Sequence, residues 1–147
     1  MFAYVARRAE KDIVQAAVTG TGLALEYASP GMKNTRDLVL AAVKNRGRAL
    51  QYASPGLQND EEVVIAAVQQ NVHALEYASD AIKNNERIVT AVVSRRGEAL
   101  EHASPGLQNN RDVVMVAVKQ RGRALQYASE GLRNDKEVVM AAEAARQ

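Results

Sequence analysis

The sequence predicts an all-α fold, an α-solenoid built from 25-residue helical-hairpin repeats, with about five full units and a terminal helix. The dipeptide Ala-Leu returns at a fixed interval, beginning at Ala24, Ala49, Ala74, Ala99 and Ala124. A block like Val-Val-Ile-Ala-Ala-Val keeps the same register, beginning at Ile13, Leu38, Val63, Ile88, Val113 and Val138. A fixed period along the whole chain is the signature of a repeat architecture.

This register predicts one helical-repeat domain over residues 1–147. We number its repeats 1 to 6, and their boundaries are 10–34, 35–59, 60–84, 85–109, 110–134 and a partial 135–147. One hairpin of this length cannot bury its own apolar face, so we expect the repeats to stack on one another.

Each repeat is expected to begin with an α-helix, which in repeat 3 follows Asp60 and runs to about residue 70. Asp60 is a favourable N-cap, and Glu61 and Glu62 place negative charge where the helix dipole favours it. Residues able to accept a backbone N–H bond stand at the same position of the other repeats: Thr35, Asn85, Asn110 and Asp135. Apolar residues at i, i+1, i+4 and i+5 then form one broad buried face.

Glycine follows this helix in four repeats, at Gly22, Gly47, Gly97 and Gly122. Glycine tolerates the left-handed backbone with which many helices end, so we expect that conformation here. Repeat 3 has Val72 instead, and its turn must therefore be built differently.

A second, shorter helix is expected next, as over residues 48–53. Ser54 and Pro55 then predict a capped further helical turn, because proline fits the first helical position. Leu57 would anchor that turn in the core, and Asn59 tolerates the reversal into the next repeat.

The bulk composition limits the classes of function. There are 19 Lys and Arg against 17 Asp and Glu, so the net charge of +2 neither requires nor excludes a nucleic-acid partner. The absence of Cys excludes disulfides and thiolate chemistry. No apolar run approaches the ~18 residues that a membrane span needs, and the N-terminal residues do not have the order of a secretory signal. We therefore expect a soluble, intracellular protein in the cytoplasm.

No residue constellation indicates catalysis, a cofactor or a metal site. His73 stands at a freely varying position, and His102 replaces a recurrent tyrosine. Ser104 belongs to a repeated capping turn, and residues 19–22 lack the preceding strand and the lysine of a phosphate loop. The sequence therefore predicts that the protein is not an enzyme and needs no cofactor.

One aromatic position recurs every 25 residues, at Phe2, Tyr27, Tyr52, Tyr77, His102 and Tyr127. The row either packs between repeats, with its hydroxyls at the edge, or stacks bases or receives a peptide. Packed helices are about 8–10 Å apart, wider than stacked bases, which favours the packing interpretation.

The turn between the two helices of each repeat varies while the framework around it stays nearly constant. In a solenoid these turns line up along one edge. The candidate contact residues are Lys44, Asn45, Arg46, Arg48, Arg95, Arg96, Lys119, Arg121 and Arg123. They form either an ordinary solvated loop row or a contact surface for an acidic partner or a phosphate backbone.

The motifs Asp-x-Val-Val-x-Ala-Ala-Val, Gly-x-Ala-Leu-x-Tyr-Ala-Ser and Leu-x-Asn-Asp resemble a family of short tandem repeats catalogued as domain of unknown function 4116. The resemblance covers about residues 10 to 143 and implies a repeat fold but no activity.

A weaker likeness is to the DNA-reading repeats of transcription-activator-like effectors, which also have a Val-Val helix, a glycine turn and an Ala-Leu-Glu helix. Their base-reading pair would fall on Thr19-Gly20, Lys44-Asn45, Gln69-Gln70, Ser94-Arg95 and Lys119-Gln120. The repeat of this chain is shorter, which changes the superhelical pitch on which groove tracking depends.

Taken together, these patterns predict a protein-interaction or scaffold repeat module without catalytic activity. The alternative is a nucleic-acid-binding helical repeat that uses the inter-helix turn residues. We expect a protein partner and no membrane association, and self-association through open repeat ends is a further prediction.

Overall fold

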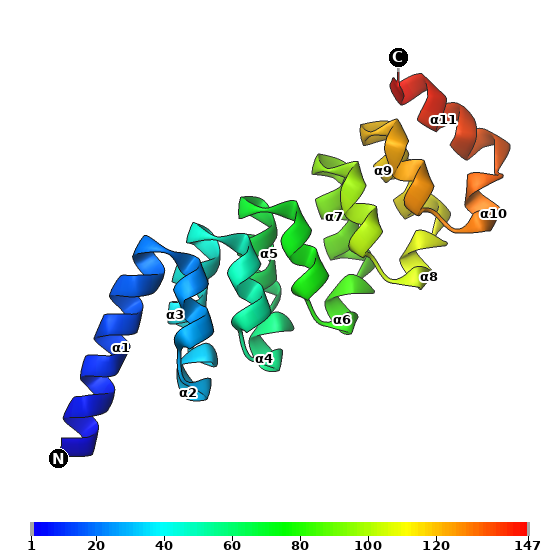
Figure 1. Cartoon of the computed structure of the whole chain (residues 1–147). Helices are drawn as coiled ribbons and strands as arrows, with labels where there is room; N and C mark the ends of the chain where they lie inside the picture. The colour runs from blue at the N-terminus through cyan, green and yellow to red at the C-terminus, as the bar shows by residue number, and fades with distance from the viewer. Residues whose placement is uncertain (1, 147) are drawn as a thin grey trace. The chain divides into compact units, whose positions relative to one another are not determined.

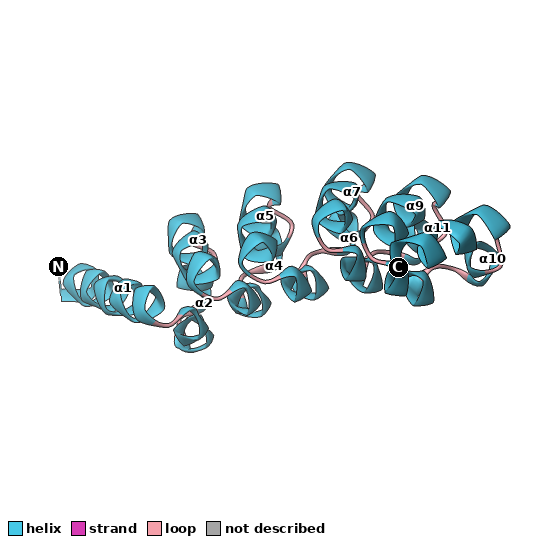
Figure 2. Cartoon of the chain, turned by 90° about the horizontal axis from the view of Figure 1, so that it is seen from above, coloured by secondary structure: helices cyan, strands magenta, loops and turns pink. Residues whose placement is uncertain are grey.

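The computed structural model describes the backbone of residues 2–146 and the side chains of residues 11–146. This part of the chain contains eleven α-helices and five 3-10 helices. Figure 2 shows helices and the loops between them, and no strand, in this part of the chain. The all-α repeat class predicted from the period is therefore confirmed. None of the described helices is both long and apolar enough to cross a membrane.

Each full repeat consists of a long α-helix, a six-residue 3-10 helix and a four-residue α-helix (Figure 1). In repeat 2 these are α3 (Arg36–Asn45), η2 (Gly47–Tyr52) and α4 (Pro55–Gln58). The other elements are α1 (Phe2–Gly20), η1 (Gly22–Tyr27), α2 (Pro30–Lys33), α5 (Glu61–Gln70), η3 (Val72–Tyr77), α6 (Asp80–Lys83), α7 (Glu86–Arg95), η4 (Gly97–His102), α8 (Pro105–Gln108), α9 (Arg111–Gln120), η5 (Gly122–Tyr127), α10 (Glu130–Arg133) and α11 (Lys136–Arg146).

The second helix of the hairpin is a 3-10 helix. Its ends are closed by bonds between residues three apart, from Ala49 N–H to Arg46 C=O at 2.9 Å and from Ala53 N–H to Leu50 C=O at 3.1 Å. Both flanking residues, Arg46 and Ala53, have extended backbones. So short a segment between two extended residues suits the tighter 3-10 geometry, which is used in short pieces.

The chain groups into two compact units, Met1–Ala78 and Ser79–Gln147. In the N-terminal unit α1, α3 and α5 pack side by side and η1, η2 and η3 form a second row against them. In the C-terminal unit α7, α9 and α11 pack in the same way, with η4 and η5 as the second row. The interpretation of residues 1–147 as a single domain stays a prediction.

The core of each unit is made of small and branched side chains from the long helices. In α3 the side chains of Leu38, Val39, Ala42 and Val43 are completely buried. The 3-10 helix η2 packs against α3, and its Ala49 and Leu50 are buried as well. Alanine at these positions lets neighbouring helices approach closely, which suits a core with few large side chains.

The recurrent glycines have a different purpose from the one predicted. No described glycine has a positive φ angle, so the left-handed helix end is wrong. A Cβ atom on Gly47 would instead collide with the carbonyl oxygen of Ala67 in the long helix of the next repeat. The same collision is found for Gly22 with Ala42, Gly97 with Ala117 and Gly122 with Ala142. Glycine is required because one repeat approaches the next too closely for a side chain.

The turn of repeat 3 has the same backbone as the other turns although Val72 replaces the glycine, so the prediction that it is built differently is wrong. The preceding residue, Asn71, accepts a bond at its Oδ1 atom from the N–H of His73 at 3.0 Å. Its backbone stays extended, as in the turns that contain glycine.

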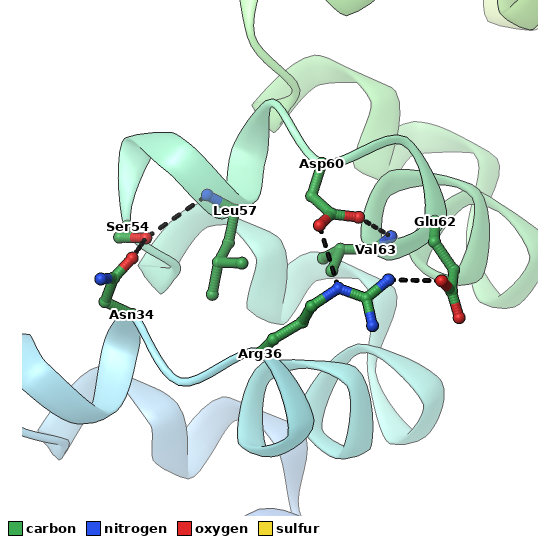
Figure 3. Close-up of polar contacts among 7 residues, drawn as sticks. All are labelled: Asn34, Arg36, Ser54, Leu57, Asp60, Glu62 and Val63. Atoms are coloured by element: carbon green, nitrogen blue, oxygen red, sulfur yellow. Dashed lines mark hydrogen bonds and ion pairs between the residues drawn. The ribbon is translucent and has the colours of Figure 1, made fainter.

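The long helices are capped mostly as predicted. Asp60 Oδ1 accepts a bond from the N–H of Val63 at 3.1 Å (Figure 3). Asn85, Asn110 and Asp135 cap their helices in the same way. Thr35 does not, because its hydroxyl donates to the Gly31 carbonyl at 3.0 Å instead.

The serines that precede the short helices have two roles: Ser29, Ser54, Ser79 and Ser104 cap these helices, and Ser54, Ser104 and Ser129 join consecutive repeats. Ser54 Oγ accepts a bond from the N–H of Leu57 at 3.4 Å and donates to Asn34 Oδ1 of the preceding repeat at 2.6 Å (Figure 3). In the C-terminal unit the same donation joins Ser104 to Asn84 at 2.7 Å and Ser129 to Asn109 at 2.6 Å. The recurrent asparagine thus binds the next repeat, a role beyond the chain reversal that its composition predicted.

Gly47→Ala should lower the free energy of unfolding by about 2 kcal/mol or more, because its methyl group must displace a backbone carbonyl. Urea unfolding followed by circular dichroism measures this change. Gly31→Ala is the matched control, since nothing lies within 4 Å of a Cβ atom at Gly31. Equal unfolding midpoints for the two variants would contradict the close-approach explanation.

Asp60→Asn should reduce the dependence of stability on acid pH. The hydrogen bond from Arg36, with that from the Val63 N–H, holds the pKa of Asp60 below its usual range. A lowered pKa in the folded state stabilises the fold above the unfolded pKa of about 4, and this contribution is lost as pH falls below it. Asparagine keeps the cap, as Asn85 does. The urea midpoint should therefore fall less between pH ~7 and pH ~3 in the variant. Arg36→Gln should flatten the profile likewise, and three identical profiles would overturn this assignment.

Candidate functional site

The candidate site lies on the turns that join each long helix to its 3-10 helix. We call these segments the turn edge: residues 19–23, 44–48, 69–73, 94–98 and 119–123. Each turn passes from the last helical residues through one extended residue, such as Arg46 with φ −139° and ψ 108°, into the 3-10 helix. The residue after Arg46 is the buried Gly47, which fixes the turn against the next repeat.

In the N-terminal unit the predicted contact residues all come from one turn. Lys44, Arg46 and Arg48 are exposed, whereas Asn45 is half-buried. Asn45 Oδ1 accepts a bond from the N–H of Gly22 in the preceding repeat at 2.6 Å. Three of the four residues are therefore accessible to a partner, and the fourth holds two repeats together.

In the C-terminal unit the predicted residues come from two adjacent turns. Arg95, Arg96, Lys119, Arg121 and Arg123 are all exposed. The turns are joined by a bond from the Gly97 N–H to Gln120 Oε1 at 2.6 Å. They are also joined by an ion pair between Arg121 Nε and Glu98 Oε1 at 2.9 Å. The fold thus brings these five cations into one neighbourhood.

The sequence analysis did not predict the structural role of two residues of the edge. Gln70 and Gln120 accept the glycine N–H bonds of Gly47 and Gly97, as Asn45 accepts that of Gly22. The period contains this signal, because a side-chain amide occupies this position in repeats 2, 3 and 5. The period could not show what this amide binds, which is the backbone N–H of a glycine in the preceding repeat.

Arg146 was also missed, although it lies 25 residues after Arg121 and therefore at the same position of the repeat. It is exposed and belongs to the last turn of α11. A Cβ atom on Gly122 would lie 2.7 Å from its Cγ atom, so Arg146 extends over the turn of repeat 5.

Charge is segregated on the turn edge. Its segments contain eight of the 19 Lys and Arg residues of the chain but one acidic residue, Glu98. Because the whole chain has a net charge of only +2, the remaining sequence is net negative. The edge lies at the carboxyl ends of the long helices, where the helix dipole favours cations. The opposite ends carry ion pairs such as Arg36 with Asp60 at 3.0 Å and Arg111 with Asp135 at 3.5 Å.

The recurrent aromatic position lies at the far end of each 3-10 helix from the turn. Tyr27 is 85% exposed, whereas the rings of Tyr52, Tyr77 and Tyr127 are half-buried. Burial and the nearby carboxylate of Glu26 raise the pKa of Tyr52, and burial with Glu101 and Glu98 raises that of Tyr127. Half-burial favours the packing role for these rings.

The residues considered for catalysis in the sequence analysis lie on the 3-10 helices and at the ends of α-helices. His73 is exposed on η3 and His102 is half-buried on η4. Ser104 caps α8, accepting the N–H of Leu107 at 3.2 Å, and the Thr21 N–H closes α1 on Ala17 C=O at 2.7 Å. The absence of catalytic activity stays a prediction.

The stacked repeats and their shared register place the chain in the class of all-helical tandem-repeat proteins. The sequence profile of the family described as Domain of unknown function (DUF4116) matches residues 10–58, 35–83, 85–130 and 110–142. The chain belongs to this family, so the resemblance seen in its repeated motifs is confirmed. Comparison with curated proteins and with solved structures gave no match.

Asn45→Ala should lower the free energy of unfolding by about 1–2 kcal/mol, because the part-buried N–H of Gly22 loses its acceptor. Lys44→Ala, one residue earlier and exposed, should change it by less than about 0.5 kcal/mol. Urea denaturation of both variants compares the two effects. If the Lys44 variant loses as much stability, the structural role of Asn45 is wrong.

Proposed function

We propose that this protein is a partner-binding repeat module without catalytic activity, which contacts a protein partner along the turn edge. The observation that carries the proposal is the contrast between framework and turn. The framework positions, among them the turn glycines, are nearly constant and mostly buried, whereas most other turn positions vary and are exposed. Repeat proteins use such variable surface positions on a fixed scaffold for recognition.

The charge of the edge indicates the chemistry of the partner. Exposed cations on the turns of each unit attract acidic surfaces, steer their approach and orient them. Most of these cations are arginines, whose planar guanidinium pairs with carboxylates in two-point geometry. An acidic protein surface therefore fits the edge.

Nucleic-acid binding is the second candidate, and the same cations favour it. The inter-repeat bonds argue against base reading of the transcription-activator-like kind. The second member of the proposed reading pair is Asn45, Gln70 or Gln120 in three repeats, and each accepts a glycine N–H of the preceding repeat. The candidate is therefore contact with the phosphate backbone rather than with base edges.

The combined substitutions Arg46→Asn, Arg96→Asn and Lys119→Gln should reduce capture of a protein partner about tenfold without unfolding the chain. Repeat 3 already carries Asn71 and Gln69 at these positions, so the turn tolerates both residues. The measurement is cross-linked capture from cell extract, quantified by mass spectrometry, with circular dichroism as the test of folding.

The matched control removes the same charge at the opposite ends of the long helices. It combines Lys33→Gln, Lys83→Gln and Arg133→Gln, which copy Gln58 and Gln108 of the neighbouring repeats. The turn edge would not be the contact surface if the control variant lost as much of a partner as the edge variant did. The same conclusion would follow if the edge variant captured its partners as well as the wild type does.

Nucleic acid is tested by fluorescence anisotropy with labelled random duplex DNA and single-stranded RNA at low and physiological salt. Micromolar binding that weakens steeply with salt would favour the second candidate over a protein partner. No binding even at low salt would remove nucleic acid from consideration.

A further inference from the structure

The ion pair between Arg121 and Glu98 defines a recurring geometry on the turn edge of the C-terminal unit. The arginine occupies the extended residue of one turn, and its partner lies 23 residues earlier, on the first turn of the preceding 3-10 helix. One repeat further along, the same two positions are held by Arg146 and Arg123. Arg123 thus occupies the position that Glu98 holds in the ion pair one repeat earlier.

The structure brings these two arginines to the same turn. Arg123 follows Gly122 on η5, and the Cγ atom of Arg146 lies over Gly122. Both side chains are exposed, and no ion pair of the described residues involves either one. The nearest acid along α11 is Glu143, one helical turn before Arg146. Two arginines on one turn without a shared carboxylate favour the binding of an external anion.

We propose that Arg123 and Arg146 bind a carboxylate from an acidic segment of a protein partner, in the position that Glu98 takes against Arg121. This inference rests on the proposed function and specifies its partner as a glutamate- or aspartate-rich segment. One observation favours a peptide over a single-stranded nucleic acid. The turns 94–98 and 119–123 contain no aromatic side chain on which a base could stack.

The test uses the whole chain and a fluorescein-labelled oligoglutamate peptide, with affinity measured by anisotropy at physiological salt. Arg123→Glu should weaken binding about fivefold or more, because the new carboxylate pairs with Arg146 and repels the peptide. The variant should keep the wild-type urea midpoint, since the same pair of residue types already exists at Glu98 and Arg121.

The reciprocal variant, Glu98→Arg, should strengthen binding by several-fold. It removes the internal partner of Arg121 and reproduces the pair of cations that Arg123 and Arg146 form. A gain in affinity cannot result from damage to the fold, so this variant separates recognition from stability. Unchanged or weaker binding by Glu98→Arg would overturn the proposal.

Arg133→Glu is the charge-matched control. Arg133 is exposed in the same unit, on α10, at the opposite ends of the long helices. It should change peptide affinity by less than about twofold, because charges separated by more than a Debye length of about 8 Å are largely screened. An effect as large as that of Arg123→Glu would show that only net charge matters and would overturn the site.

Competition identifies the class of ligand. Unlabelled oligoglutamate should displace the probe more effectively than random duplex DNA at equal charge concentration. The reverse order would show that the ligand is a phosphate chain and not an acidic peptide.

Failure of this site can be distinguished from failure of the proposed function. If the triple edge variant loses a cellular partner that Arg123→Glu retains, this site is wrong and the partner-binding function stands. If the peptide responds as expected but no cellular partner depends on the edge, the site stands and the function is wrong.

Discussion

The close approach between each turn glycine and the next long helix is the constraint on which the stack depends. Gly47 lies so near the Ala67 carbonyl that no side chain fits, and its N–H is bonded to the side-chain oxygen of Gln70 in the same helix. Van der Waals contact and hydrogen bond thus act on one residue. Together they fix how far apart, and in which register, two repeats of a unit stand. The serine–asparagine bond at the other end of the long helices adds a second fixed point.

This constraint also gives the proposed contact surface a fixed backbone. The glycine of a turn such as 44–48 is fixed by its contacts with the next repeat. The backbone of the residues on either side of this glycine is therefore held in place as well. A pre-organised surface loses less conformational entropy on binding than a mobile loop. The buried glycine and the exposed arginines are therefore two parts of one arrangement.

The two ends of the long helices show how similar residues acquire different roles. At the amino ends, Arg36 is paired with Asp60 across neighbouring repeats and stabilises the stack. At the carboxyl ends, Arg121 has one carboxylate partner, Glu98. The position of Glu98 is held by another arginine, Arg123, in the next repeat. What separates a stabilising arginine from one available to a ligand is the residue that the register places opposite it. Membership of the family fixes the scaffold, and the binding that we propose depends on these variable positions.

The sequence by itself determined the repeat, its helical class, the extent of the long helices and most of their caps, because all of these depend on local periodicity and on residues three or four apart. Only the tertiary structure decided why glycine follows the long helix, that Asn45 is a structural residue, and that Arg146 joins Arg123 on one turn. Those facts depend on contacts between residues about 20 to 26 positions apart. The period reveals that such positions are equivalent, but not which of them touch. The prediction of a left-handed turn was wrong for that reason. The sequence shows that a residue is glycine, which is conformationally free, but it does not show the carbonyl group of the next repeat that leaves no room for a side chain.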